Sequence, residues 1–297
     1  MRSAIARRAR LLLAIAPLAL GASAWAQQGA EPATYWALAP IALGLLAGIT
    51  VLIGTFLTYR ARSRASGSTL GVLQASAGGI LAYLALETGH AAEEYVEDLA
   101  SWSTLSDFAV AAVATTAAFL GTFFALTAAE RASLRRGARQ SLTTAFVIST
   151  ALGVHNVGEG FAIAASLLSG APALAVLFAV GFAVHNATEG FAITGPLLAD
   201  RGVSATPSTL ASLSLLAGLP TVLGSGAYYL GLQSALALAV LNAVANASIV
   251  YAMLHVNLNA LSRLGGVSSP KFWAALTAGV ALAFTTESIL MLAGLNA

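Results

Sequence analysis

A six-residue motif built from histidine, asparagine and glutamate occurs twice in this chain. Its copies are His155–Gly160, with the sequence HNVGEG, and His185–Gly190, with the sequence HNATEG. In a helix, residues four apart share one face, so each histidine stands one turn from the glutamate of its own copy. Imidazole and carboxylate groups are ligands of Zn²⁺ and other first-row divalent cations. The motif therefore predicts a divalent-metal site, with candidate ligands His155, Asn156, Glu159, His185, Asn186 and Glu189.

The composition predicts that this site lies in lipid. Apolar residues make up 58% of the chain and charged residues 9%, and the mean hydropathy is +0.82. Because a soluble domain is about one quarter charged, the chain is expected to have lipid as its solvent. Cysteine is absent, which excludes disulfides, thiolate zinc sites and cysteine nucleophiles. Ionisable groups inside a membrane are costly, so two imidazole–carboxylate pairs there indicate function rather than packing.

Eight apolar stretches have about the length of a membrane-spanning helix. They are residues 36–58, 69–90, 106–129, 142–168, 173–198, 209–231, 233–257 and 271–295. The connections between them are short, so residues 27–297 are predicted to form one transmembrane domain. The predicted fold class is an all-α integral membrane protein with eight transmembrane helices.

Residues 1–26 are predicted to be a signal peptide. Arginines at positions 2, 7, 8 and 10 precede an apolar run from residue 11 to about residue 22, and Ala24-Trp25-Ala26 is a small-x-small cleavage site. The competing interpretation is an uncleaved first helix, but the run is short for a membrane span. Cleavage would leave the mature N-terminus outside the cytoplasm.

The basic residues predict the orientation of the helices. With an outer N-terminus, the connections after the first, third, fifth and seventh spans face the cytoplasm. All basic residues of the mature chain fall in or beside these connections: Arg60, Arg62, Arg64, Arg131, Arg135, Arg136, Arg139, Arg201, Arg263 and Lys271. This agrees with the positive-inside rule and accounts for the pI of about 9.2 without a nucleic-acid partner. The chain is thus expected to cross the inner membrane with both termini outside.

The connection after the second span is acidic. Glu93, Glu94, Glu97 and Asp98 are predicted to lie in a loop there, with Asp107 just beyond it. One interpretation is a solvated acidic loop. The other is an anionic vestibule that concentrates cations at the outer mouth.

The two copies of the motif extend beyond six residues. Residues 153–168 and 183–198 match at ten of sixteen positions, and the short turn between the fourth and fifth spans makes these helices antiparallel. Each histidine lies near the middle of its span, so both pairs are predicted to meet at the same depth. The asparagines beside the histidines have amide oxygens for the ion or hydrogen bonds for the helix backbone. Gly158, Gly160 and Gly190 are expected to allow close helix approach.

Consecutive helices carrying His-Asn-x-x-Glu-Gly, within eight spans with outer termini, resemble the ZIP family of divalent-metal transporters. The resemblance covers nearly all of the mature chain, and its specific part is the pair of motif-bearing helices. It implies a ZIP-type bundle in which His155, Asn156, Glu159, His185, Asn186 and Glu189 line the transport site. It also implies import of zinc, iron, manganese or cadmium toward the cytoplasm, and a homodimer.

The chain departs from the family pattern at two places. The family usually has proline directly before the glutamate, where this chain has Gly158 and Thr188. A proline there would bend the helix, so the local geometry is expected to differ. Related bacterial members often carry a glutamate before a proline in the sixth helix, where this chain has Leu219-Pro220. A single principal metal site is therefore predicted.

Four further polar residues in the spans are candidates for an ion pathway: Glu87, His90, His255 and Glu287. Glu87 and His90 share a face near the outer end of the second span and suit an entrance site or residues that reach interfacial water. His255 suits a ligand on a release path or an interfacial residue. Glu287 has no evident basic partner in its helix and suits a structural or an ion-path role.

The leading interpretation is a permease, not an enzyme, with Zn²⁺ or another divalent cation as its cargo and no resident cofactor. The alternative is a haem-binding electron-transfer protein with His155 and His185 as axial ligands. The glutamate one turn beyond each histidine argues against haem. An intramembrane metalloprotease would carry His-Glu-x-x-His, which does not occur, and no nucleotide-binding loop is present.

Overall fold

The computed structural model describes residues 38–62, 66–102, 105–199, 205–231 and 234–294. The predicted signal peptide, residues 1–26, lies outside these ranges. Within them the chain is helical and contains no strand. The helices are α2 (Ala39–Ile49), α3 (Val51–Ala61), α4 (Gly67–Trp102), α5 (Leu105–Arg135), α6 (Gln140–Leu168), α7 (Pro172–Ala199), α8 (Pro207–Gly218), α9 (Pro220–Ser225), the 3₁₀ helix η2 (Gly226–Leu230), α10 (Ala235–Leu264) and α11 (Pro270–Gly294).

Among the described residues, eight helices are long and apolar enough to cross a membrane. The pair α2 and α3 makes up the first of them, and α8, α9 and η2 together make up the sixth. This agrees with the number predicted from the apolar stretches. Helices α5 and α10 continue further than expected: α5 ends at Arg135 rather than near residue 129, and α10 ends at Leu264 rather than near residue 257.

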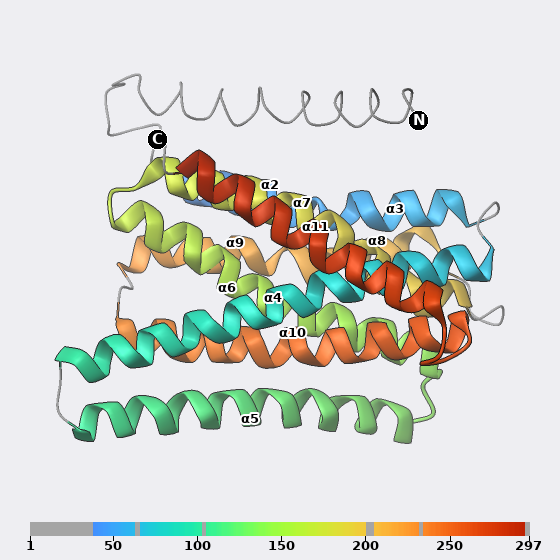
Figure 1. Cartoon of the computed structure of the whole chain (residues 1–297), viewed down its shortest axis with the longest axis horizontal. Coiled ribbons are helices and arrows are strands. Elements are labelled where there is room, and N and C mark those ends of the chain that lie inside the picture. Colours follow the sequence, from blue (N-terminus) through green and yellow to red (C-terminus); the bar gives the residue numbers. More distant parts are fainter. Residues whose placement is uncertain (1–37, 63–65, 103–104, 200–204, 232–233, 295–297) are drawn as a thin grey trace.

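The two ends of the bundle carry charges of opposite sign. Successive helices run in opposite directions, so the ends of α3, α5 and α10 lie together on the right of Figure 1. The described basic residues lie at or beside this end, here called the arginine end: Arg60, Arg62, Arg131, Arg135, Arg136, Arg139, Arg263 and Lys271. The opposite end, here called the acidic end, carries Glu93, Glu94, Glu97 and Asp107.

The acidic residues after the second span lie on a helix, so the predicted loop is wrong. Helix α4 continues without interruption from Gly67 to Trp102. His90 stands 3.9 Å from Glu93 and 3.7 Å from Glu94, one turn further along, and these side chains are about 70% exposed. Pairs at this spacing support a helix after its apolar stretch has ended, so α4 extends past the predicted boundary.

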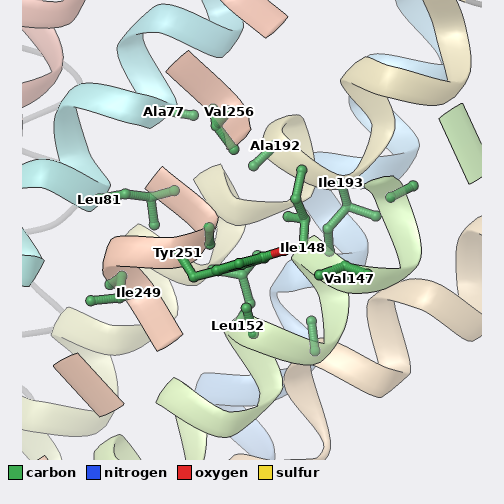
Figure 2. Close-up of a cluster of buried hydrophobic side chains, with 14 of the residues drawn as sticks. Ala77, Leu81, Val147, Ile148, Leu152, Ala192, Ile193, Ile249, Tyr251 and Val256 are labelled. Carbon is green, nitrogen blue, oxygen red and sulfur yellow. The ribbon is translucent and has the colours of Figure 1, made fainter. Parts of the chain in front are cut away.

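The main core lies where α4, α6, α7 and α10 converge. Figure 2 shows Tyr251 of α10 among side chains from these helices, including Leu81, Ile148 and Ile249. Helix α5 is the most exposed of the eight and packs chiefly against α10 (Figure 1). The four central helices therefore form the frame that holds the duplicated motif.

The first and sixth spans carry a second internal repeat. Leu43, Leu45, Leu46, Ala47, Gly48 and Gly54 recur in the same spacing as Leu213, Leu215, Leu216, Ala217, Gly218 and Gly224. Both spans break within one residue of matching positions, after Ile49 in the first and after Gly218 in the sixth. The sixth breaks at Pro220, which cannot donate a backbone hydrogen bond. Since the two spans run in opposite directions, the repeat is inverted.

Glycines of this repeat allow the broken spans to contact each other and the motif helices. A Cβ on Gly48 would overlap the carbonyl of Gly218, and a Cβ on Gly218 would overlap the carbonyl of Gly48. Such small-residue contacts let transmembrane helices pack backbone to backbone. The first and sixth spans therefore cross directly at their breaks.

The last glycine of each motif copy makes a matching close contact. Gly160 lies against the backbone of α9 beside Gly224, and Gly190 lies against the backbone of α3 beside Gly54. The prediction that these two motif glycines allow close helix approach is confirmed. Gly158 instead meets only the side chain of Ala245.

Candidate metal centre

The two motif copies meet inside the bundle, on antiparallel helices joined by a tight turn. Gly170 takes a left-handed conformation with φ of 77°, which lets the chain reverse between α6 and α7. His155, Asn156 and Glu159 are buried on α6, and Asn186 and Glu189 are buried on α7. The predicted meeting of both copies at one depth is therefore seen in the contacts between them.

Glu159 is the centre of the histidine-bearing part of the site. Its Oε1 lies 2.5 Å from Nε2 of His185 and 3.6 Å from Nε2 of His155. Its Oε2 accepts a hydrogen bond of 2.8 Å from the amide nitrogen of Asn186. One carboxylate of the first copy thus contacts the histidine and the asparagine of the second.

The asparagines cross between the copies. Asn156 donates a hydrogen bond of 3.1 Å to Oε2 of Glu189, as Asn186 does to Glu159. In each case the amide nitrogen of one copy donates to the glutamate of the other and so positions that carboxylate. The amide oxygens of both asparagines have no hydrogen-bond partner among the described residues.

Each asparagine also donates a hydrogen bond to a carbonyl beside one of the helix breaks. Asn156 donates to the carbonyl of Ala217 at 3.1 Å, and Asn186 donates to the carbonyl of Ala47 at 3.4 Å. Ala217 lies in the last turn of α8 and Ala47 in the last turn of α2, where helix carbonyls lack helical partners. The inverted repeat and the duplicated motif are thus joined by matching hydrogen bonds.

Several buried polar atoms of the site have no hydrogen-bond partner in the described part of the chain. They are both ring nitrogens of His155, Oδ1 of Asn156, Oδ1 of Asn186, Oε1 of Glu189 and Oγ1 of Thr221. Buried polar atoms normally pair, so this group, with its two amide oxygens and one carboxylate oxygen as acceptors, marks a place suited to a cation. The imidazole nitrogens suit Zn²⁺ and other first-row transition ions, and the oxygens suit a harder ion.

A large cavity leads to the histidine side of the site. It has a volume of about 770 Å³, and His155, Glu159 and His185 are among its lining residues. Tyr95 of α4 and Ser169, at the end of α6, also line it. Because these two residues lie near the acidic ends of their helices, the cavity runs from the site toward the acidic end.

The bundle is closely packed on the other side of the site. Ala192, Ile193 and Leu197 follow Glu189 on α7 and are almost fully buried. Nearer the arginine end, Arg263 of α10 donates a hydrogen bond of 2.6 Å to the carbonyl of Gly195. Among the described residues, this side of the site is therefore more tightly packed than the side that faces the cavity.

The four candidate pathway residues fall into two groups. Glu87 and Glu287 line the cavity together with His185. His90 lies outside the cavity lining and pairs with Glu93 and Glu94 on the surface of α4. Of the pair predicted for an entrance, Glu87 therefore lines the cavity and His90 does not, and Glu287, predicted to have a structural or an ion-path role, shares the lining with Glu87.

His255, the fourth candidate, belongs to a polar cluster between α5 and α10. Its Nε2 lies 3.3 Å from Oε2 of Glu130, and the hydroxyl of Tyr251 donates to the same oxygen at 2.6 Å. None of these three side chains lines the cavity. Glu130 was not singled out from the sequence because it stands one residue beyond the predicted third span, whereas α5 continues to Arg135.

In this conformation, no three histidine, aspartate or glutamate side chains of the described residues are grouped closely enough to hold a metal ion. The reason is visible in the contacts: Glu159 is occupied by His185 and Asn186, and Glu189 by Asn156. No protein-family model matches the chain, and no curated protein matches it.

Proposed function

We propose that the chain is a divalent-metal transporter of the ZIP type, with Zn²⁺ as its first candidate cargo and Fe²⁺, Mn²⁺ and Cd²⁺ as alternatives. The observation that carries the proposal is the position of Glu159. This buried carboxylate contacts His185, lies 3.6 Å from His155, and stands at the inner limit of a cavity. Imidazole and carboxylate ligands bind first-row divalent ions without the permanence of thiolates, as a carrier requires.

The cavity accounts for how the ion reaches this site. Its volume of about 770 Å³ exceeds that of an ion with six waters, roughly 180 Å³ at about 30 Å³ per water. A hydrated ion can therefore approach the histidines before it loses water. Glu87 and Glu287 add negative charge along the way and favour cations over anions.

At the site, the protein ligands replace the waters of the ion. His185 and Glu159 share a hydrogen bond, so a proton between them has to leave when the metal binds. Glu159 then neutralises part of the charge of the ion, and Asn186 keeps the carboxylate in place. Release at the arginine end requires the packing around Ile193 and Leu197 to open.

The proposal extends to orientation and assembly. The charge division between the bundle ends supports an arginine end in the cytoplasm and an acidic end outside the inner membrane. With this orientation, the cavity faces outward and transport is inward. A homodimer, which the family resemblance implies, is part of the same proposal.

The haem alternative is less well supported by the same contacts. A haem held by His155 and His185 would have its ring between the two imidazoles. Oε1 of Glu159 occupies that space, 2.5 Å from one imidazole and 3.6 Å from the other. A carboxylate there suits a cation and has no role in bis-histidine ligation of haem.

Uptake of radioactive zinc by proteoliposomes tests the proposed function. Glu159→Gln and His185→Ala are expected to lose uptake while inserting normally. Glu130→Gln is the matched control, because it also neutralises a carboxylate within a span but lies outside the cavity lining. Wild-type uptake by both site variants would refute the proposal, and a Soret band in the purified protein would favour the haem alternative.

A further inference from the structure

The cavity is larger and more apolar than an ion pathway requires. Its lining includes Leu84, Phe161, Phe178, Phe182, Leu238 and Leu241. A hydrated metal ion gains nothing from such walls. Sites that bind drug-sized molecules have volumes of about 300–1,000 Å³, apolar and aromatic walls and a few convergent polar groups, and this cavity has all three properties.

An aromatic ladder on α7 runs along the cavity toward the histidines. The rings of Phe178 and Phe182 are stacked, with centroids 5.6 Å apart and an interplanar angle of 6°. The ring of Phe182 lies 5.5 Å from that of His185. Both phenylalanines pack on one side against a small buried cluster that includes Ala175 and Ala179, so the helix surface behind them is filled.

Two carboxylates of the cavity are left for a charged ligand. Glu87, Glu159 and Glu287 line it together with His155 and His185, and no lysine or arginine is among the described residues that do so. Since Glu159 is paired with His185, Glu87 and Glu287 remain. Aromatic faces attract cations, and the attraction grows when the site excludes water. Carboxylates and aromatic rings together therefore select an apolar molecule with a positive charge over a neutral or negative one.

We propose that this cavity binds an amphipathic organic cation, such as an amine or an onium ion with an aromatic body. The apolar body lies against Phe178 and Phe182, and the positive charge lies toward Glu87 and Glu287. An occupied cavity blocks the approach of a metal ion to Glu159. The binding itself needs no transported metal, so it stands independently of the proposed function.

Binding of tetraphenylphosphonium to the purified protein in lipid nanodiscs, without metal, tests this inference. Saturable binding above that of empty nanodiscs is expected. Tetraphenylborate has the same shape and the opposite charge, so it is expected not to compete. Equal competition by tetraphenylborate, or the absence of saturable binding, would overturn the proposal.

Variants locate the bound probe. Phe178→Ala is expected to weaken tetraphenylphosphonium binding about tenfold, the size of a partly desolvated cation–π contact. Phe146→Ala is the matched control, because this phenylalanine of α6 is 46% exposed and outside the cavity lining. Zinc uptake, measured separately, is expected to be unchanged in Phe146→Ala. Equal probe affinity of Phe178→Ala and wild type would overturn the placement, whatever the outcome for zinc.

Discussion

The two copies of the motif have nearly the same sequence and different surroundings. Glu159 of the first copy touches an imidazole and an amide and lines the cavity. Among the described residues, Glu189 of the second copy has Asn156 as its one hydrogen-bond partner, keeps one oxygen unpaired and lies outside the cavity lining. Similar sequence therefore does not give the two glutamates the same surroundings. The site is predicted to have a histidine side that receives the ion first and an oxygen side behind it.

The largest expected effect separates the two glutamates. Glu159→Gln is expected to weaken zinc binding by more than about a hundredfold, because it removes the proposed carboxylate ligand that lies close to both histidines. Glu189→Gln is expected to weaken it by about tenfold or less, because Glu189 contacts neither imidazole. Equilibrium binding of radioactive zinc to the purified variants measures both. Equal losses would show that the copies act as one symmetric site.

A second prediction compares the asparagines, which act on opposite glutamates. Asn186→Ala releases Glu159 and is expected to weaken zinc binding by about tenfold to a hundredfold, as loss of a supporting hydrogen bond does. Asn156→Ala releases Glu189 and is expected to have a smaller effect on zinc. The same zinc-binding measurement applies. A larger loss in Asn156→Ala would reverse the assignment of the two sides.

The hydrogen bond between His185 and Glu159 predicts a pH dependence of metal binding. A metal ion binds the deprotonated ligands, so it displaces the shared proton and its apparent affinity falls as the pH is lowered. Titration of the protein with Zn²⁺ in weakly buffered solution measures the protons released. Glu159→Gln is expected to release fewer protons than Glu189→Gln. The same release from both variants would show that the proton does not come from this pair.

The smallest expected effect on metal is at Tyr251, outside both sides of the site. Tyr251→Phe removes a hydrogen bond of 2.6 Å to Glu130. Such bonds inside membrane proteins contribute about 1 kcal/mol, so thermal stability is expected to decrease slightly while zinc affinity stays unchanged. A thermal unfolding assay and zinc binding on the same samples test this. A clear loss of zinc affinity would connect the Glu130 cluster to the site.

Much of this arrangement is predictable from local sequence. Apolar length gives the eight spans, and the four-residue spacing of His185 and Glu189 on antiparallel helices gives the meeting of the copies. Helix ends are less predictable: α4 passes Glu93 and Glu94 because charged side chains at helical spacing support a helix beyond its apolar stretch. A hydropathy profile detects where lipid ends and does not detect where the helix ends.

The differences between the copies could not be predicted from the motif itself. They depend on residues distant in sequence, such as Ala47 and Ala217, whose carbonyls fix the asparagines. The repeat that supplies these carbonyls is visible in the sequence only when residues 43–54 are aligned with residues 213–224. Its meaning depends on which helices touch, and local periodicity carries no information on that.

The turn of three residues between α6 and α7 also has a consequence for how the protein is made. A glutamate that enters the bilayer alone on a helix costs about 2.5–3.5 kcal/mol by insertion scales. Because α6 and α7 are consecutive, Glu159 finds Asn186, and Glu189 finds Asn156, as soon as this hairpin closes. These two helices can therefore enter the bilayer together, with the asparagine of each helix hydrogen-bonded to the glutamate of the other before the remaining spans are inserted.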